Sequence, residues 1–473
     1  MAKKIEANIL KGFRDILPDE MLAREKVIAV IKEVYESYGF SPLATPALEH
    51  QDLLLGGGEE ANKQIYLFTD PDGYEVGLRY ELTASLKRVI AQNRQLPRPF
   101  KRYQIEPVWR YDKPDPGRFR EFLQFDIDTV GSSSMIADAE IISAMHDALK
   151  KLDLNFKIRF SSRKILNSLI EFAGLTPEMT HPVCRVLDKL DKQGLEAVKL
   201  ELGPGRIDDS GDKIAGLELT DKTIARVEEF LSLPQSTRAE AIESLRGLFK
   251  DVDSAVEAID ELEQIHDYLA AMGITDDTVP IDLSIARGLD YYTGPVFEAI
   301  LTDKKSARIG SVMGGGRYDN SIGEYTGVNT PATGASIGVD RLLAAMIKLK
   351  KVHLRPSTAD VIVAVMMKDK IVEYSKIARE LREAGFNTEL YLGNAKAIGK
   401  QLKYADRQEI PVAVLLGEDE LESGQVSIKN LRTIKETEVD ITDRAEWIEV
   451  KVGQETISRD QMIPHIKKIL GRK

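Results

Sequence analysis

A pair of strand-like segments joined by a short charged loop is the feature that most constrains the fold of this chain. Residues 100–109 and 118–130 both show the composition and alternation of β-strands. The loop between them, residues 110–117, is charged and contains two prolines. Two strands joined by so short a connection predict a long hairpin in an antiparallel sheet.

The second strand of this hairpin has two chemically different faces. Alternate side chains point to opposite sides of a strand, so residues 117–128 can be sorted by position. One face is apolar and carries Phe119, Leu123, Phe125 and Ile127. The other face carries Arg118, Arg120, Phe122, Gln124, Asp126 and Asp128. Two arginines, an aromatic ring, an amide and two carboxylates favour a binding surface, although on this strand alone a solvated face remains the alternative.

The domain organisation is discontinuous. Residues 1–176 and 277–347 are predicted to form one core domain, and a lysine-rich linker over 348–357 precedes a last domain over 358–473. The intervening residues 177–276 are rich in Lys, Glu, Asp and Leu and show helical periodicity, which predicts a helical insertion. A chain of 473 residues is long enough for two or three domains.

Local patterns place several elements in these domains. A proline-interrupted strand is expected over residues 40–49, and strand-like alternation returns after the insertion at 279–285 and 291–301. In the last domain strands and helices alternate, which is typical of a small α/β domain. The elements expected there are strands at 361–365, 388–392 and 411–416, a helix ending near Gly385 and a helix over 396–407.

The composition argues against several classes of protein. No apolar run approaches the ~20 residues of a membrane helix, and no leader-like apolar stretch follows the first lysines, so a cytoplasmic protein is expected. The single cysteine, Cys184, excludes an intrachain disulfide. The six histidines are scattered, none at the spacing of a helical zinc pair, so no metal site is expected. A net charge of −11 means that any RNA must meet a local basic patch.

Four further segments carry patterns that suggest a site. Residues 78–85 form a strand end followed by a helix start, where a hydroxyl could simply cap the helix and have no further role. Residues 285–294 place an arginine and two tyrosines beside glycines. Residues 314–319 are rich in glycine but fit neither a dinucleotide fingerprint nor a P-loop. Residues 333–342 form a small-residue strand that runs into a helix. Each segment has a purely structural interpretation when it is taken alone.

Together, and in this order, the five segments resemble the class II aminoacyl-tRNA synthetases. Residues 45–49 are similar to the first motif of that class, the strand that forms the dimer. Residues 110–122 resemble the second motif and residues 338–341 the third. Residues 287–292 and 315–319 are similar to signatures of the histidyl-tRNA synthetase family. The resemblance covers the core and the last domain and is weakest in the insertion.

The resemblance implies both a fold and an activity. The fold is α+β, with an antiparallel-sheet catalytic core, a helical insertion and a small α/β anticodon-binding domain. The activity is ATP-dependent ligation of L-histidine to its tRNA through a histidyl-adenylate, with release of AMP and pyrophosphate. The implied substrates are L-histidine, ATP with Mg²⁺ and tRNA(His), and the implied assembly is a homodimer. No permanently bound metal or organic cofactor is expected.

The resemblance also assigns residues to ATP. Adenylate formation brings an ionised carboxylate to a polyanion, so the site must supply fixed positive charge. By resemblance, Arg110 and Arg287 flank the α-phosphate and the substrate carboxylate. Arg118 reaches the outer phosphates, and Arg341 stacks on adenine opposite Phe122.

Recognition of histidine requires hydrogen-bond partners for both nitrogens of the imidazole. The resemblance assigns Asp128 and Tyr292 to the ring, with Tyr291 beside it. Many bacterial members of the family have Glu where Asp128 stands, and the shorter side chain changes the distance to the ring. The residues assigned to the ammonium group and neighbouring atoms are Glu81, Leu82, Thr83, Gln124 and Tyr318.

A basic stripe in the last domain is the candidate tRNA-binding surface. Lys396, Lys400, Lys403 and Arg407 recur at helical spacing and therefore share one helix face. A solvated helix face is the alternative interpretation. The resemblance favours binding to tRNA phosphates.

Two other functions are weighed against this interpretation. A catalytically silent regulatory paralogue, attached to histidine biosynthesis, would lack the last domain and the site arginines, which are present here. Another class II synthetase, for proline, threonine or glycine, would not be expected to carry the segment 287–292. A pure RNA-binding or scaffold protein leaves the arginines and carboxylates unexplained.

Overall fold

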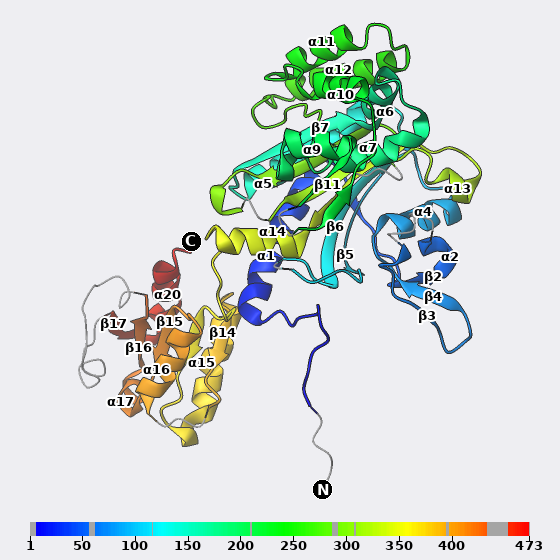
Figure 1. Ribbon diagram of the computed structural model, residues 1–473. Coiled ribbons are helices and arrows are strands. Elements are labelled where there is room, and N and C mark those ends of the chain that lie inside the picture. Colours follow the sequence, from blue (N-terminus) through cyan, green and yellow to red (C-terminus); the bar gives the residue numbers. More distant parts are fainter. Residues whose placement is uncertain are drawn as a thin grey trace. The chain divides into compact units, whose positions relative to one another are not determined.

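The computed structural model describes residues 6–55, 62–115, 117–208, 211–285, 292–306, 309–393, 397–432 and 453–472. The chain divides into two compact units (Figure 1). The larger unit contains Met1–Arg14 and Lys26–Val352, and the smaller unit contains Asp15–Glu25 and His353–Lys473. Among the described residues, no helix combines the length and apolarity that a bilayer crossing requires.

A seven-stranded sheet forms the centre of the larger unit, with the order β1-β5-β6-β12-β11-β10-β7. Its strands are β1 (Ser41–Pro42), β5 (Phe100–Trp109), β6 (Glu121–Val130), β7 (Phe156–Ser162), β10 (Pro295–Leu301), β11 (Ser311–Arg317) and β12 (Ala332–Gly338). Neighbouring strands are antiparallel, except that the short β1 runs parallel to β5. The predicted antiparallel core is confirmed (Figure 1).

Strands β5 and β6 form the expected long hairpin, paired from Phe100↔Val130 to Trp109↔Glu121. Strand β6 begins three residues later than predicted, because the preceding backbone is engaged elsewhere. The amide of Arg120 donates to the carbonyl of Gly12 at 2.8 Å, and the amide of Arg118 donates to Asp115 at 2.7 Å. These bonds hold the residues before β6 in the loop.

Helix α5 (Ile136–Lys151) covers the apolar face of this sheet and packs against strands β6, β7, β10, β11 and β12. Phe125 and Ile127 of β6 are fully buried on that face. Tyr35 of α1 (Pro18–Ser37) packs edge-on against Phe125, with ring centroids 5.0 Å apart. The remaining helices of the core are α2 (Gln51–Leu54), α4 (Thr83–Gln92), α6 (Arg163–Phe172), α13 (Gly323–Thr326) and α14 (Val339–Lys348), with a 3-10 turn at Lys304–Ser306.

The strand predicted over residues 40–49 is divided between two sheets. Strand β2 (Leu48–His50) leaves β1 and joins β4 (Glu75–Leu78) and β3 (Leu67–Thr69) in a three-stranded sheet. The reason lies in the carbonyls of Thr45 and Pro46, which accept hydrogen bonds of 2.7 and 3.1 Å from the guanidinium of Arg79 instead of pairing in a ladder.

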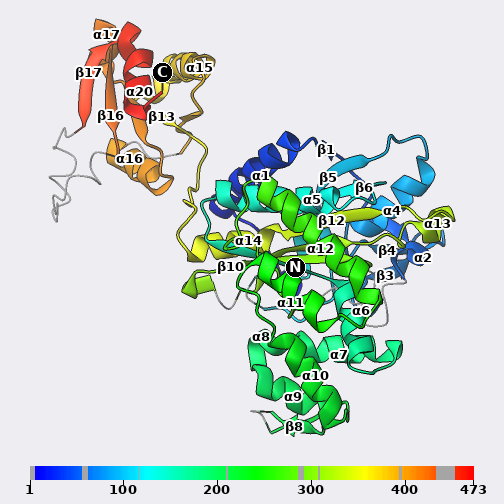
Figure 2. The same cartoon turned by 90° about the horizontal axis from the view of Figure 1, so that it is seen from above.

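The insertion is helical, as predicted. Its helices are α7 (Thr180–Leu187), α8 (Leu190–Gln193), α9 (Leu195–Leu202), α10 (Asp221–Leu231), α11 (Arg238–Leu248) and α12 (Ser254–Ala271), preceded by a 3-10 turn at Pro177–Met179. It also contains an unpredicted hairpin of β8 (Gly205–Ile207) and β9 (Lys213–Ala215) beside α9 (Figure 2). The strand predicted at 279–285 is wrong: Ile281 makes only one isolated bridge, to Phe160. The segment lies along the edge of β7, where the amide of Phe160 donates to Pro280 and the amide of Asp282 donates to Phe160, but Pro280 has no amide hydrogen to extend a ladder.

The smaller unit is the predicted α/β domain. Its sheet has the order β14-β13-β15-β16-β17, with α16 packed on one face and α15 and α20 on the other. The first three strands in that order are parallel and the last two antiparallel. The elements are β13 (Val361–Val363), α15 (Ile371–Glu383), β14 (Thr388–Leu390), α16 (Ile398–Arg407), β15 (Val412–Leu415), α17 (Glu418–Ser423), β16 (Gln425–Asn430), β17 (Gln454–Ser458) and α20 (Met462–Leu470), with 3-10 turns at Lys368–Lys370 and Arg459–Gln461.

A glycine in β12 provides a test of the sheet packing. A Cβ at Gly334 would lie 2.0 Å from Oδ1 of Asp128 and 2.6 Å from the carbonyl oxygen of Ile127. We expect Gly334→Ala to lower the free energy of unfolding of the larger unit by about 1–3 kcal/mol, measured by thermal denaturation. Gly247→Ala is the matched control, because Gly247 is exposed in α11 with nothing within 4 Å. It should stabilise α11 by about 0.5–1 kcal/mol. Equal effects of the two changes would contradict the packing argument.

Candidate active site

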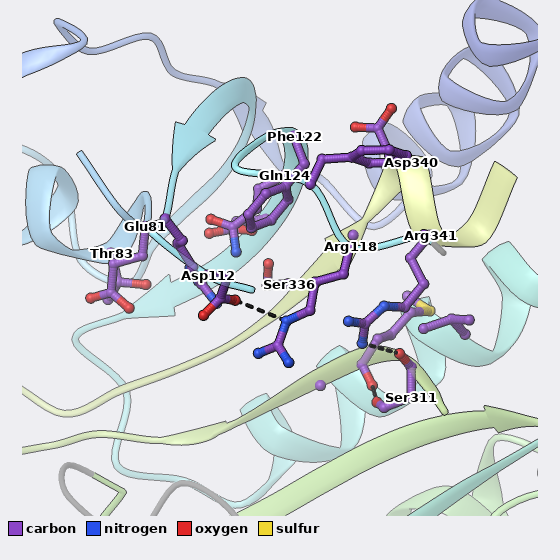
Figure 3. Close-up of a pocket in the computed structure, with 18 of the residues that line it drawn as sticks. Glu81, Thr83, Asp112, Arg118, Phe122, Gln124, Ser311, Ser336, Asp340 and Arg341 are labelled. Carbon is purple, nitrogen blue, oxygen red and sulfur yellow. Dashed lines mark hydrogen bonds and ion pairs between the residues drawn. The ribbon is translucent and has the colours of Figure 1, made fainter. Parts of the chain in front are cut away.

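A cavity of about 290 Å³ opens on the polar face of the large sheet (Figure 3). Strands β6, β11 and β12, the loop before β6 and the first turns of α4 and α14 all contribute to it. Its lining residues are Glu81, Thr83, Arg110, Asp112, Gly117, Arg118, Phe119, Phe122, Gln124, Asp126, Tyr292, Ser311, Val312, Met313, Gly314, Ser336, Gly338, Asp340 and Arg341. Segments that are far apart in the sequence therefore meet in one space.

Cross-strand register explains why these side chains meet. Gln124 and Asp126 project from the same face of β6, and Asp126 stands opposite Ser336 of β12. Gly314 of β11 follows as the partner of Ser336, so the next position in the row carries no side chain. The small side chains of β11 and β12 leave the polar groups of β6 uncovered, which creates the floor of the cavity.

Three of the predicted arginines line this cavity. Nε of Arg110 donates to the carbonyl of Tyr80 at 2.9 Å, and its guanidinium carbon lies 5.3 Å from the ring centroid of Phe122. Nε of Arg118 is 2.9 Å from Oδ2 of Asp112, and Nη1 of Arg341 donates to the carbonyl of Ser311 at 3.0 Å. Figure 3 shows Arg118 and Arg341 both pointing into the cavity. Their terminal groups thus supply positive charge there.

Asp340 holds the first turn of α14 against the sheet. Its Oδ1 pairs with Arg14 at 3.0 Å, and its Oδ2 accepts the amide of Leu123 at 2.7 Å. Arg14 in turn lies 4.2 Å from the ring centroid of Phe119. Sequence reasoning missed this arrangement, because no local pattern connects Arg14 with a carboxylate 326 residues away.

The two aspartates of β6 have different surroundings. Asp126 lines the cavity, whereas Asp128, the residue predicted to contact the imidazole, is not among the lining residues. Asp128 Oδ2 lies 2.7 Å from Nη2 of Arg102, and Tyr318 donates its hydroxyl to Oδ1. Both Arg102 and Asp128 are almost completely buried. In the described structure Arg102 therefore neutralises the carboxylate of Asp128, although Oδ2 of Asp128 makes no hydrogen bond to the described residues.

The carboxyl group of Asp126 titrates near neutral pH. Burial raises the pKa of Asp126 to about 7, against the attraction of Arg102, while Asp128 and Glu81 raise it further. One carboxylate oxygen, Oδ1, has no hydrogen-bond partner among the described residues, and neither does Oε1 of Gln124. Two buried acceptors that line one cavity predict a ligand rich in N–H groups.

The remaining residues predicted to bind histidine divide into three groups. Glu81, Thr83, Gln124 and Tyr292 line the cavity. Leu82 is fully buried at the start of α4, and Tyr318 is buried against Asp128. Residues 286–291, which include Arg287 and Tyr291, lie outside the described residues. The structure thus brings half of these eight predicted residues to the cavity.

Two buried arginines on these strands are structural. Arg317, in the glycine-rich segment 314–319, faces away from the cavity and pairs with the buried Asp138 of α5. Arg102 holds Asp128 from the neighbouring strand. The signal for Arg102 was available in the hairpin register, where it stands opposite Asp128, but registers are not fixed by sequence pattern alone.

The basic stripe of the smaller unit lies on α16. Lys400, Lys403 and Arg407 are all exposed, and Lys396 lies outside the described residues. Leu402 and Ala405, on the opposite side of the same helix, are buried against the sheet. The helix therefore presents a positively charged outer face.

Comparisons with known proteins agree with this architecture. A family model described as Histidyl-tRNA synthetase matches residues 12–342, and one described as Anticodon binding domain matches residues 360–451. The histidine–tRNA ligase of Bartonella henselae is 40% identical, covering 99% of this chain and 98% of the relative. That of Dinoroseobacter shibae is 43% identical, covering 90% of each chain.

A solved structure is also similar. The crystal structure of histidyl-tRNA synthetase from Nostoc sp. PCC 7120 matches with a TM-score of 0.81 and 28% sequence identity. The match covers 98% of this chain and 100% of that one. The chain belongs to the histidyl-tRNA synthetase family, because the family model matches most of the larger unit and a relative is 40% identical along nearly the whole length.

Proposed function

We propose that this chain joins L-histidine to its tRNA using ATP, through a histidyl-adenylate, with release of pyrophosphate and then AMP. The cavity on the polar face of the large sheet is the observation that carries the proposal. It combines three arginines with a hydrogen-bonding surface that includes two carboxylates, Glu81 and Asp126. Anion binding and amino-acid binding are thus provided in adjoining parts of one space.

In the first step an oxygen of the histidine carboxylate bonds to the α-phosphorus of ATP, and the bond to the pyrophosphate oxygen breaks. The carboxylate is already ionised, so the protein supplies fixed positive charge and not a base. We assign Arg110 to the α-phosphate and the substrate carboxylate, together with Arg287. We assign Arg118 to the outer phosphates, and Phe122 and Arg341 to the two faces of adenine.

For histidine itself we propose a revised assignment. Asp126, Glu81 and Gln124 line the cavity and accept N–H groups of the substrate, with Thr83 and Tyr292 beside them. Asp128, paired with Arg102 and Tyr318, holds the strand and orients Tyr318. Rejection of apolar amino acids follows, because they would leave buried acceptors without donors.

Magnesium is proposed to enter with ATP. Two of the carboxylates near the phosphates are already paired, Asp112 with Arg118 and Asp340 with Arg14. The described residues contain no group of three or more His, Cys, Asp or Glu side chains placed to hold a metal. The phosphate oxygens are therefore the main ligands, and the ion adds charge neutralisation. No permanently bound metal or organic cofactor is part of the proposal.

In the second step a hydroxyl of the terminal ribose of tRNA attacks the acyl carbon, and AMP leaves. We propose that the smaller unit holds the same tRNA through phosphates on the exposed face of α16. We also propose a cytoplasmic homodimer. Exposed apolar side chains on the three-stranded sheet and in the turn before β4 support the dimer, since a partner subunit would cover some of them; they are Leu48, Leu67, Phe68 and Tyr74.

The regulatory-subunit alternative is not favoured. The C-terminal unit is present, and Arg110, Arg118 and Arg341 line the cavity. A binding subunit would have no use for a cationic phosphate site beside an amino-acid pocket.

The first test is pyrophosphate exchange. The purified chain should incorporate labelled pyrophosphate into ATP only with L-histidine, and not with proline, threonine or glycine. Arg341→Ala should lower the exchange rate by about 10²–10³-fold, because fixed charge at the nucleotide is removed. Lys348→Ala, at the exposed end of the same helix, should leave it unchanged. Exchange with another amino acid would refute the substrate assignment.

The second test concerns Asp126. Because its pKa of about 7 lies above the ordinary value, the carboxyl group gains a proton as pH falls through 7 and can no longer accept two N–H groups. The KM for histidine should therefore rise as the pH falls from about 8 to about 6. Asp126→Asn should raise the KM for histidine by ~10–100-fold above neutral pH. It should also make KM depend less on pH. The titration of free histidine itself affects the unaltered protein and the variant equally.

Asp128→Asn provides the comparison for Asp126→Asn. It removes the anion beside the buried Arg102, so it should lower the melting temperature, whereas Asp126→Asn should not. If Asp126→Asn binds histidine normally while Asp128→Asn loses only histidine affinity, the two assignments must be exchanged.

The third test concerns α16. Lys400→Ala combined with Lys403→Ala should raise the KM for tRNA. It should also weaken the salt dependence of binding: the slope of log K against log salt concentration should change by roughly one unit for each lysine that no longer neutralises a phosphate. Histidine-dependent exchange should not change. Lys376→Ala, an exposed lysine of α15, is the matched control and should have no effect. An unchanged KM for tRNA in the double variant would rule out this face as the tRNA-binding surface.

A further inference from the structure

Residues 12–14 lie against the part of the cavity that is assigned to ATP, although they precede the first helix of the chain. Arg14 contacts Asp340, in the first turn of α14, and Phe119, in the loop before β6. Both of these residues line the cavity, whereas Arg14 is not among its lining residues. Arg14 therefore contacts the walls of the site and not the space where a ligand would lie.

An ion pair joins Arg14 to the first turn of α14. Nη2 of Arg14 lies 3.0 Å from Oδ1 of Asp340, whose other oxygen accepts the amide of Leu123 at 2.7 Å. Asp340 is only 3% exposed, so its carboxylate has lost most of its hydration and depends on a countercharge. Arg341 follows in the same turn and points into the cavity (Figure 3). Arg14 thus holds the turn that carries a guanidinium assigned to adenine.

A second contact joins Arg14 to the loop before β6. Its guanidinium carbon lies 4.2 Å from the ring centroid of Phe119, within the range of a cation–π contact. Phe119 directly follows Arg118, the residue assigned to the outer phosphates. One guanidinium therefore connects the two segments that supply Arg118 and Arg341.

Gly12 holds the same loop through its backbone. Its carbonyl accepts the amide of Arg120 at 2.8 Å, and Nε of Arg120 donates to the carbonyl of Asp112 at 3.2 Å. The side chain of Asp112 in turn pairs with Arg118 at 2.9 Å. Gly12 has a φ of +87°, and a Cβ there would lie 2.7 Å from Cγ of Arg120. Glycine is therefore the residue that permits this close approach without strain.

We propose that Arg14 is a positioning residue for ATP. Through Asp340 and Phe119 it keeps Arg341 and Arg118 at the separation that one bound nucleotide requires. The inference rests on the proposed function, which assigns this end of the cavity to ATP.

Histidine binding should not depend on Arg14. Glu81 and Thr83, which are assigned to histidine, lie just before and at the start of α4. That segment is separate in the sequence from the loop before β6 and from α14. The loss of Arg14 should therefore affect the two substrates unequally.

The test is pyrophosphate exchange by the full chain, at varied ATP and at varied L-histidine. Arg14→Gln should raise the KM for ATP by ~10–100-fold, because a small misplacement of binding groups is costly, and should leave the KM for histidine unchanged. KM does not depend on the amount of folded enzyme. A residue that only stabilised the fold would therefore lower the apparent kcat and leave both KM values as they were.

Two variants at neighbouring positions separate contact from charge. Arg14→Lys keeps a positive charge beside Asp340 but loses the flat guanidinium over Phe119, so its KM for ATP should lie between those of the unaltered protein and Arg14→Gln. Lys11→Gln is the matched control, because it removes one positive charge from an exposed side chain of the same segment. Its KM for ATP should equal that of the unaltered protein.

Gly12→Ala tests the same loop from the backbone side. The added Cβ should displace Arg120 and raise the KM for ATP without changing the KM for histidine. Gly39→Ala is its control, because Gly39 has a similar φ of +79° but nothing within 4 Å of the added Cβ. Gly39→Ala should leave both KM values unchanged.

A double-mutant cycle tests whether Arg14 acts through Asp340. Asp340→Asn keeps an oxygen that can accept the amide of Leu123 but removes the charge. If the two residues act as a pair, Arg14→Gln should add little to the increase in the KM for ATP that Asp340→Asn causes alone.

Three results would overturn the inference. The first is an Arg14→Gln protein that raises neither KM value or raises both equally. The second is a Lys11→Gln protein whose KM for ATP rises as much as that of Arg14→Gln, and the third is full additivity in the cycle with Asp340→Asn. Failure of the proposed function is distinct from these, because it would appear as exchange that does not depend on histidine in the unaltered protein.

Discussion

The pairing of β6 with β12 is the constraint on which the rest of the larger unit depends. It sets Asp126 opposite Ser336 and Asp128 opposite Gly334, so that one row opens into the cavity and the next is closed. Gly334 is required in the closed row, because the carboxylate of Asp128 occupies the space of a Cβ. A shift of one residue would turn every polar side chain of β6 towards the apolar helix α5.

Charged side chains have different partners in the buried part of this sheet and at the cavity. Inside it, buried arginines and carboxylates neutralise one another, as in Arg102 with Asp128 and Arg317 with Asp138. At the cavity, the bond of Arg118 to Asp112 leaves further N–H groups of its guanidinium for a ligand. The difference separates residues that pair within the sheet from residues that line the cavity, although both kinds are arginines and aspartates in the sequence.

Sequence patterns predicted the antiparallel hairpin, the helical insertion and the small α/β domain because each has a strong local period. They also brought Arg110, Arg118, Gln124 and Arg341 into one site through the resemblance. Sequence patterns do not distinguish the surroundings of Asp126 from those of Asp128, since both lie on one face of β6 and only the register with β5 pairs Arg102 with Asp128. Which of the two contacts histidine stays a prediction. Likewise, the split near Thr45 depends on Arg79, a contact between distant residues.

The position of β12 also bears on how the chain is made. Strand β6 ends at Val130, but its second neighbour lies about 200 residues later, beyond the whole insertion. At ordinary synthesis rates of ~5–20 residues per second, the nascent sheet waits roughly 10–40 seconds with an open edge. During that interval its unpaired amides and carbonyls can pair with another ribosome-bound chain. We therefore expect the nascent chain to need chaperones most during this part of its synthesis.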